Sequence, residues 1–206
     1  MNISITGNLG SGKSSICTVL SQKGYEVISA GSIFRELAVE RGLSVEEFNK
    51  KVNEDIKRGD RSVDDLIDKR TALLDSQRDN VVFDSRLAWN FAPRSFKVFV
   101  KVDADEAAKR VYQDSKRADS EKYDSLEQCK EALLCRQRME QDRFRELYGL
   151  DYFNADNYDL VIESTHADAT QIAEKILEYF IAYQTNPQKV VLAQSHTLLF
   201  SSSSDF

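Results

Sequence analysis

A short stretch at the start of the chain constrains the fold more than any other. Residues 2–6 alternate between apolar and polar side chains, which predicts a strand, and residues 12–23 predict a helix. Between them lies the pattern Gly7-x-x-x-x-Gly12-Lys13-Ser14, which is the phosphate-binding loop pattern of nucleoside-triphosphate-binding proteins. The pattern therefore stands in the strand–loop–helix context that it requires.

The residue types of this loop suit phosphate. Glycines let consecutive backbone N–H groups turn toward one centre, and the helix N-terminus adds unpaired donors and a positive dipole end. Lys13 can reach the β- and γ-phosphates, and the Ser14 hydroxyl can bind Mg²⁺. A glycine-rich turn followed by a chance Lys-Ser pair is the alternative. The predicted ATP-binding residues are Gly7, Asn8, Leu9, Gly10, Ser11, Gly12, Lys13, Ser14 and Ser15.

Composition narrows the class of protein. A chain of 206 residues predicts one domain, and its net charge of −6 argues against a general nucleic-acid binder. Its 3 cysteines form no C-x-x-C pair, which favours a reduced, cytoplasmic compartment. The chain opens on a strand rather than a leader, and no apolar run approaches the ~20 residues of a membrane span. We therefore expect a cytoplasmic protein with no nucleic-acid or membrane partner.

Four further apolar segments predict strands, over residues 25–29, 80–84, 96–102 and 158–162. The strands alternate with helical segments, which is typical of crossover connections and a mainly parallel sheet of about five strands in a three-layer α/β fold. Ligands bind beyond the carboxyl ends of the strands in such sheets. We expect the phosphate-binding loop, residues 29–35 and residues 84–86 to meet on one rim.

The remaining chain predicts helices and two irregular segments. Capping boxes at Ser44–Glu47 and Ser125–Gln128 open predicted helices, the second running to about residue 148. Residues 85–94 are predicted to be a loop. The charged residues 116–124 lack apolar periodicity and are predicted to form a lid. Residues 184–206 contain a run of serines and are predicted to form a flexible tail. The helix that follows Ser44 is predicted to cover residues 45–57. The other predicted helices cover residues 31–42, 62–77, 104–115 and 168–183.

Charged residues near the predicted rim are candidates for phosphate chemistry. Asp84 closes an apolar strand, where a carboxylate can orient Mg²⁺ or its water, and Arg86 could hold an acceptor phosphate. Arg35, one turn into a helix, could grip a phosphate with its guanidinium. The alternatives are a turn-forming aspartate and ordinary surface arginines.

Several arginines flank the predicted lid: Arg110, Arg117, Arg136 and Arg143. Arg136 and Arg143 are seven residues apart and share a helix face, whereas Arg138 and Arg145 share a different face. Only one of the two pairs can face the nucleotide, and the sequence leaves the choice open. Phosphoryl transfer requires positioning and positive charge around the moving group, which such arginines supply.

Three stretches resemble the short, archaeal-type cytidylate kinases. They are residues 29–48 (SAGSIFRELAVERGLSVEEF), residues 84–88 (DSRLA) and residues 143–151 (RFRELYGLD). Together with the phosphate-binding loop, the resemblance covers about residues 1–182 in the expected order. Lys116-Arg117-Ala118 and Cys135-Arg136-Gln137-Arg138 depart from the family pattern, and the serine-rich tail is an addition.

The resemblance implies a P-loop nucleoside monophosphate kinase fold over residues 1–183, with acceptor-binding helices in about residues 31–78. It implies transfer of the ATP γ-phosphoryl group to CMP or dCMP with Mg²⁺, by a monomer or, alternatively, a dimer. The implied catalytic residues are Lys13, Asp84, Arg110, Arg117, Arg136 and Arg143. The implied acceptor-binding residues are Ser29, Gly31, Arg35, Asp64, Asp68 and Arg86, and the implied metal ligands are Ser14 and Asp84.

Two other functions stay open. One is another P-loop small-molecule kinase, such as a dephospho-coenzyme A kinase, although the Asp-x-Asp usual after the second strand of that family is replaced by Ser29-Ala30-Gly31. The other is a nucleotide-binding regulator with a kinase-like fold, which would not need acceptor-side arginines. A GTPase is disfavoured because the sequence lacks the Asn-Lys-x-Asp stretch that reads guanine.

Overall fold

The computed structural model describes residues 1–114 and 123–186. Most of the predicted lid, including Arg117, and residues 187–206 of the predicted tail lie outside the described residues. Among the described residues, no helix combines the length and the apolar character needed to span a bilayer.

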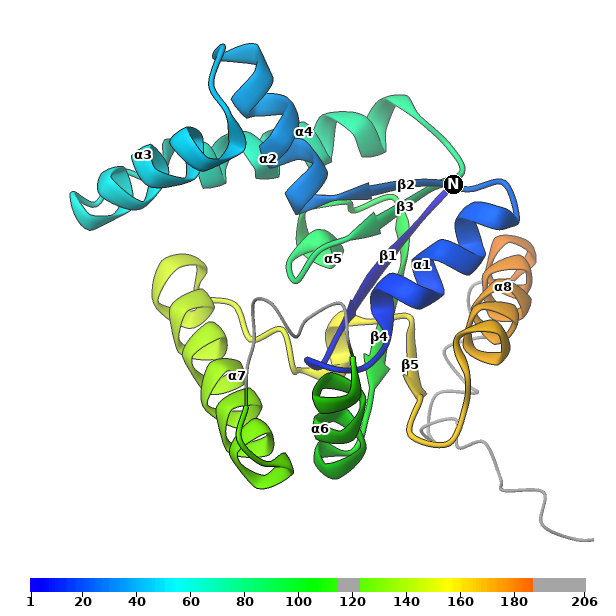
Figure 1. The fold of residues 1–206 in the computed structure, drawn as a ribbon. Coiled ribbons are helices and arrows are strands. Elements are labelled where there is room, and N and C mark those ends of the chain that lie inside the picture. Colours follow the sequence, from blue (N-terminus) through cyan, green and yellow to red (C-terminus); the bar gives the residue numbers. More distant parts are fainter. Residues whose placement is uncertain (115–122, 187–206) are drawn as a thin grey trace, which may run out of the picture.

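A parallel five-stranded sheet forms the centre of the molecule, as the alternation of strands and helices predicts (Figure 1). Its order is β2-β3-β1-β4-β5, and every neighbouring pair is parallel. The first strand in the sequence thus lies in the middle, so the loop that follows it opens at the centre of the carboxyl edge. The bounds are β1 Asn2–Gly7, β2 Glu26–Ser29, β3 Val81–Asp84, β4 Ser95–Lys101 and β5 Leu160–Glu163.

Helices cover both faces of this sheet, and the two-residue period of the strands decides which side chains meet them. On one face Ile3 and Ile5 pack with helices α1 (Lys13–Gln22) and α8 (Ala169–Thr185), which lie side by side. On the other face Tyr158 packs against both Phe99 and Trp89. Helices α6 (Ala104–Gln113) and α7 (Leu126–Tyr148) pack together at the β4–β5 side.

Three helices between β2 and β3 form an arm above the carboxyl edge of the sheet (Figure 1). They are α2 (Ala30–Glu40), α3 (Val45–Lys57) and α4 (Ser62–Gln77). The predicted capping box at Ser44 is present, with Glu47 N–H donating to Ser44 Oγ and Ser44 N–H to the Glu47 carboxylate. Phe48 is buried in the apolar cluster that joins the arm to β3.

Two local predictions were wrong. Within residues 85–94, predicted to be a loop, Ala88–Phe91 form the short helix α5. Its single turn is too short to show helical periodicity, and burial of Ala88 and Trp89 stabilises it. At the start of α7, Ser125 accepts from the Gln128 N–H, but the Gln128 side chain accepts from the Asp124 N–H. The second capping box is therefore only half formed.

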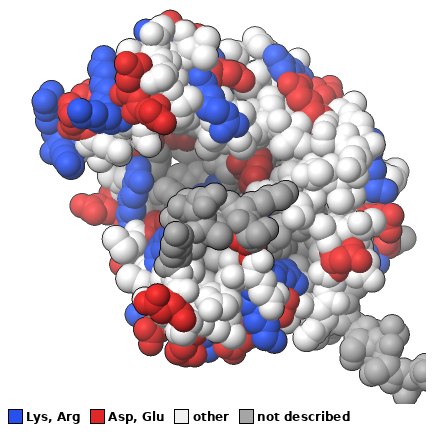
Figure 2. Space-filling model, viewed as in Figure 1, with Lys and Arg blue, Asp and Glu red and all other residues white. Residues whose placement is uncertain are grey.

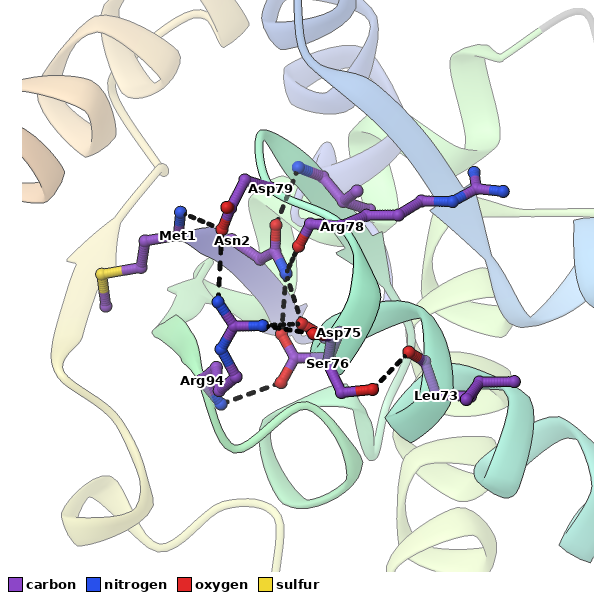
Figure 3. A network of polar contacts seen from close by, with 9 residues as sticks. Met1, Asn2, Leu73, Asp75, Ser76, Arg78, Asp79 and Arg94 are labelled. Atoms are coloured by element: carbon purple, nitrogen blue, oxygen red, sulfur yellow. Dashed lines mark hydrogen bonds and ion pairs between the residues drawn. The ribbon is translucent and has the colours of Figure 1, made fainter.

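A polar network at the opposite, amino edge of the sheet joins three segments of the chain (Figure 3). Asp75 near the end of α4 is 1% exposed and accepts from Asn2 Nδ2 (2.8 Å) and from the Arg94 backbone N–H (2.9 Å). The Arg94 guanidinium also donates to the Asp75 carbonyl, and Asp79 pairs with the N-terminal ammonium group. The network anchors the C-terminal end of α4 to the first residues of β1.

Candidate active site

The phosphate-binding loop joins the centre of the sheet to α1, and its glycines are required by close packing. A Cβ on Gly7 would lie 2.3 Å from the Val100 carbonyl oxygen, and one on Gly10 would lie 2.9 Å from the Ala107 carbonyl oxygen. Gly10 and Gly12 have φ angles of 76° and 82°. The N-terminus of α1 has no side-chain cap, so its backbone N–H groups can serve an anion.

Lys13 curls back over this loop, with Nζ 3.4 Å from the Gly7 carbonyl oxygen and 3.5 Å from that of Asn8. Burial, and then the positive charge of Arg86, lower the pKa of Lys13 to about 7. The nearby Asp84 carboxylate opposes this shift, while burial raises the pKa of Asp84. The ammonium group is therefore held in a desolvated place where an anionic ligand would stabilise its charge.

Ser14 and Asp84 border one cavity of about 370 Å³ between α1 and the ends of β2 and β3. A hydroxyl and a carboxylate supply the oxygen donors that Mg²⁺ takes in proteins when phosphate completes its shell. Ser14 and Asp84 are therefore suited to bind the predicted magnesium ion. Cys17 borders the same cavity, and burial raises the pKa of its thiol to about 12, so it stays protonated.

Arg110 from α6 lies over the other side of the loop. Its guanidinium donates to the Ser164 carbonyl oxygen (2.6 Å) and to the Thr165 carbonyl oxygen (3.2 Å), and Glu106 pairs with its Nε. It borders a cavity of about 300 Å³ along Gly10–Ser15 and another of about 500 Å³ that reaches His166. These two cavities give an elongated ligand room beside the phosphate-binding loop.

A separate cavity of about 540 Å³ lies between the helical arm and α7. Figure 2 shows this side of the molecule hollowed between the upper helices α2–α4 and the lower helices α6 and α7, with positive side chains beside the hollow. Seven of the predicted site residues line this cavity: Gly31, Asp64, Asp68, Asp84, Arg86, Arg136 and Arg143. The Asp84 carboxylate therefore borders both the Ser14 cavity and the arm cavity.

The structure decides between the two arginine pairs of α7. Arg136 and Arg143 line the arm cavity. Arg145 instead pairs with Asp151 (2.7 Å), and neither Arg145 nor Arg138 lines this cavity. The burial of Cys129 and Leu133 turns α7 so that the first pair faces the arm. Arg143 also pairs with Asp64 of α4 at 3.0 Å, across the cavity.

Glu140 of α7 contacts two of the predicted site residues. Its carboxylate accepts from Arg86 Nε (3.0 Å) and from Arg136 Nε (3.4 Å). The Arg86 and Glu140 side chains are 20% and 24% exposed. A carboxylate thus lies between Arg86, which was predicted to hold the acceptor phosphate, and Arg136, which was predicted to stabilise the transferred charge. Only the i,i+4 spacing from Arg136 hinted at part of this arrangement.

The sequence interpretation also missed Tyr148 and Arg61, which lie near the cavity wall formed by Asp68. Tyr148 Oη donates to Asp68 Oδ2 (2.9 Å), and the Arg61 guanidinium lies 4.4 Å from the centre of the tyrosine ring. Arg61 Nη1 also donates to the Leu147 carbonyl oxygen (3.1 Å). These contacts join residues more than 70 positions apart, so no local sequence pattern predicts them.

Two predicted acceptor residues lie beside the arm cavity rather than in its lining. Ser29 caps α2 by accepting from the Ser32 N–H, and it lies opposite Asp84 on the neighbouring strand, in the Ser14 cavity. Arg35 is exposed, and its Nη1 lies 3.5 Å from where a Cβ on Gly31 would be. Since Gly31 lines the arm cavity, Arg35 is near its rim.

Comparisons with known proteins agree with this geometry. The model of the cytidylate kinase-like family matches residues 2–166. A cytidylate kinase of Methanothermobacter thermautotrophicus is 32% identical over 171 residues, which cover 82% of this chain and 98% of that protein. An S-adenosylmethionine-dependent nucleotide dehydratase of Lacinutrix mariniflava is 29% identical over 86% of this chain, but the chain spans only 35% of that longer protein.

Solved structures agree on the architecture. Shikimate kinase from Aquifex aeolicus has a TM-score of 0.55 and 18% sequence identity, with 90% of this chain and 99% of that chain covered. At this identity the likeness concerns the fold alone. Together with the parallel sheet and the loop after β1, it identifies the α/β P-loop kinase fold.

Proposed function

Since this chain belongs to the cytidylate kinase-like family, we propose that it transfers the γ-phosphoryl group of ATP to a pyrimidine nucleoside monophosphate, with CMP or dCMP as the preferred acceptor. The observation that carries the proposal is the position of Asp84 and Lys13 between two anion-binding places. The phosphate-binding loop lies on one side, and the arm cavity with Arg86, Arg136 and Arg143 on the other.

In this proposal the donor triphosphate lies along the loop and the N-terminus of α1. Lys13 supplies charge to the β- and γ-phosphates, and Arg110 holds the donor side from α6. Ser14 and Asp84 would hold Mg²⁺, which would screen the phosphate charges. The loop backbone and Lys13 orient the γ-phosphorus toward the arm cavity, so that the acceptor oxygen can approach in line.

The acceptor monophosphate lies in the arm cavity. The acceptor phosphate displaces the Glu140 carboxylate and binds between Arg86 and Arg136. Arg143, on the same face of α7 as Arg136, adds positive charge. Arg35 acts from the rim near Gly31. Asp64 and Asp68, near the beginning of α4, face the base or ribose. Closure of the arm over α7 excludes water, which would otherwise hydrolyse ATP.

Two alternatives remain distinct from this proposal. A different small-molecule kinase of the same fold would use the donor side unchanged with another acceptor. A nucleotide-binding regulator would bind ATP without acceptor-stimulated turnover. The name of the Lacinutrix relative belongs to a polypeptide about three times as long as the matching region, and we do not extend its reaction to this chain.

An acceptor panel tests the proposal. The purified chain is given ATP and Mg²⁺ with CMP, dCMP, UMP, AMP, GMP, shikimate or dephospho-coenzyme A, and ADP release is measured. We expect release that depends on CMP or dCMP, with UMP slower and the others near background. Preferred use of a non-nucleotide would contradict the nucleoside monophosphate acceptor, and acceptor-independent ATP binding without turnover would favour the regulator.

A further inference from the structure

Two residues of the phosphate-binding loop join it to helix α7. Leu9 packs in the apolar cluster that also contains Cys129 and Leu133 of α7. Asn8 Nδ2 donates to Gln137 Oε1 at 3.1 Å, one helical turn beyond Leu133. Asn8 and Gln137 are 129 positions apart in the chain, and both are half-buried. The loop is therefore connected to α7 by an apolar cluster and by a hydrogen bond.

The backbone of Asn8 is fixed on the sheet. Its N–H donates to the Val100 carbonyl oxygen of β4 at 3.2 Å, and its carbonyl oxygen accepts from the Ser11 N–H at 3.3 Å. The same carbonyl oxygen lies 3.5 Å from Lys13 Nζ. With the main chain held in this way, the short Asn8 side chain sets the position of α7 relative to the loop.

A second link joins α7 to the same edge of the sheet. Thr6 Oγ1, in β1, donates to the Arg86 carbonyl oxygen at 3.4 Å. The Arg86 side chain pairs with Glu140, which lies three residues after Gln137 on α7. Thr6 and Asn8 flank the last residue of β1. The contacts through Arg86 and through Gln137 therefore close a ring, and α7 is held at two points.

The two links differ in what ligand binding does to them. In the proposed function the acceptor phosphate displaces Glu140 from Arg86, which opens one link. Neither Asn8 nor Gln137 is among the described residues that line the four cavities above, so the other link stays closed. We propose that the Asn8–Gln137 hydrogen bond keeps α7, and with it Arg136, at a fixed distance from the loop while both substrates are bound. This inference rests on the proposed function.

The reaction depends on that distance. Reacting atoms must approach to about 3–3.5 Å, and a displacement of about 1 Å can lower the rate by about 10²-fold. Arg136 precedes Gln137 on a rigid helix, so a shift of one moves the other. Gln137 is therefore a positioning residue. Its loss should lower the rate of transfer more than the affinity for either substrate.

Gln137→Met removes the acceptor oxygen and keeps the length of the side chain. We expect kcat with saturating ATP and CMP to fall at least about tenfold, while both KM values change by less than about threefold. Gln137→Glu keeps an oxygen that accepts from Asn8, so it should restore most of kcat. A loss of kcat that Gln137→Glu does not restore would contradict the hydrogen bond as its cause.

Gln141→Met is the matched control. Gln141 is half-buried one turn farther along α7 and donates to Asp151 at 3.0 Å rather than to the loop. This variant disturbs a side-chain hydrogen bond of the same helix but leaves the loop contact in place, so kcat should stay within about twofold of the wild type. Equal kcat values in Gln137→Met and Gln141→Met would overturn the inference.

A double-mutant cycle tests whether the two side chains act through one contact. Asn8→Ala removes the donor and Gln137→Met removes the acceptor. The kcat of the double variant should therefore lie within about twofold of that of the less active single variant. If the two losses multiply instead, the side chains act independently, and the proposed contact is wrong.

Hydrogen exchange separates this inference from the proposed function, because it needs only ADP and Mg²⁺ bound at the loop. ADP orders the loop, so it should slow amide exchange around Gln137 in the wild type, and Gln137→Met should abolish this slowing. That result would support the link even if no nucleoside monophosphate is phosphorylated. Equal slowing in both proteins, or none in the wild type, would overturn the inference even if CMP is phosphorylated.

Discussion

Arg86, two residues after the end of β3, and Glu140 in the middle of α7 form an ion pair of 3.0 Å at the arm cavity. Both side chains are less than one-third exposed, so the pair is screened less than a surface salt bridge. Glu140 also contacts Arg136, so one carboxylate balances two guanidinium groups. The ligand-free protein thus holds an internal anion in the place proposed for the acceptor phosphate.

Glu140→Gln should therefore destabilise the ligand-free protein. The change removes the ion-pair partner of the half-buried Arg86, which lies near Lys13, and should lower the free energy of unfolding by about 1–3 kcal/mol. Urea unfolding measures this, with the exposed Glu146→Gln on the same helix as control. Added sulfate should restore more stability to Glu140→Gln than to the wild type. Equal sulfate effects would argue that no anion binds between the arginines.

Arg86→Ala should mainly impair use of the acceptor. We expect the KM for CMP to rise at least about tenfold, since a charge-assisted contact to phosphate is lost, with a smaller change in the KM for ATP. Arg138→Ala removes an exposed arginine outside the arm cavity and is the matched control. CMP kinetics in Arg86→Ala that equal those of Arg138→Ala would remove Arg86 from the acceptor site.

Lys13→Met should lose activity but gain stability, with a defined pH dependence. Loss of one electrostatic donor should lower kcat by about 10²–10³-fold. The folded-state pKa of Lys13, about 7, lies below the ordinary lysine value of 10.5, so keeping this group protonated in the fold is unfavourable. That cost is fully present below about pH 7 and disappears as pH rises toward the unfolded value.

Unfolding experiments at several pH values check the second half of this prediction. The gain in stability from Lys13→Met should be larger at about pH 6 than at about pH 10. A gain that is the same at both pH values would show that the substitution acts through packing rather than through the buried charge. Wild-type turnover in Lys13→Met would contradict its role at the phosphates.

Asp75→Ala should destabilise the fold through the amino-edge network of Figure 3. It leaves the Arg94 backbone N–H without its acceptor and removes one bond from Asn2, so we expect a loss of about 1–3 kcal/mol. Asp79→Ala, whose side chain is 58% exposed, should cost less than about 1 kcal/mol. Denaturant unfolding measures both losses. If Asp75→Ala and Asp79→Ala lower the free energy of unfolding equally, the burial of Asp75 does not add to stability.

Local and periodic features of the chain could be predicted from the sequence. The Gly7–Ser14 pattern predicted the loop between a strand and a helix, the alternation of strands and helices predicted the parallel sheet, and the Ser44–Glu47 pattern predicted a helix start. These signals depend on neighbours within a few residues. The position of Asp84 next to the phosphate-binding loop followed from topology alone, because parallel strands end on one edge.

The contacts that complete the acceptor side could not be predicted in the same way. Tyr148 with Asp68, and Arg86 with Glu140, join residues 80 and 54 positions apart, and each depends on how α7 is rotated about its axis. The buried Cys129 and Leu133 set that rotation, but the apolar residues near both ends of the helix left it ambiguous. Helix α5 was missed because four residues carry no period.

Helix α4 connects the two ends of the molecule as one rigid rod. Its 16 residues carry Asp64 and Asp68 near the beginning and the buried Asp75 near the end. From Ser62 to Asp75 the helix spans about 20 Å, so a tilt of about ten degrees at the anchored end displaces the other end by about 3 Å. A displacement of that size equals the length of a hydrogen bond. Residues at the amino edge therefore influence how accurately Asp64 and Asp68 are positioned at the arm cavity.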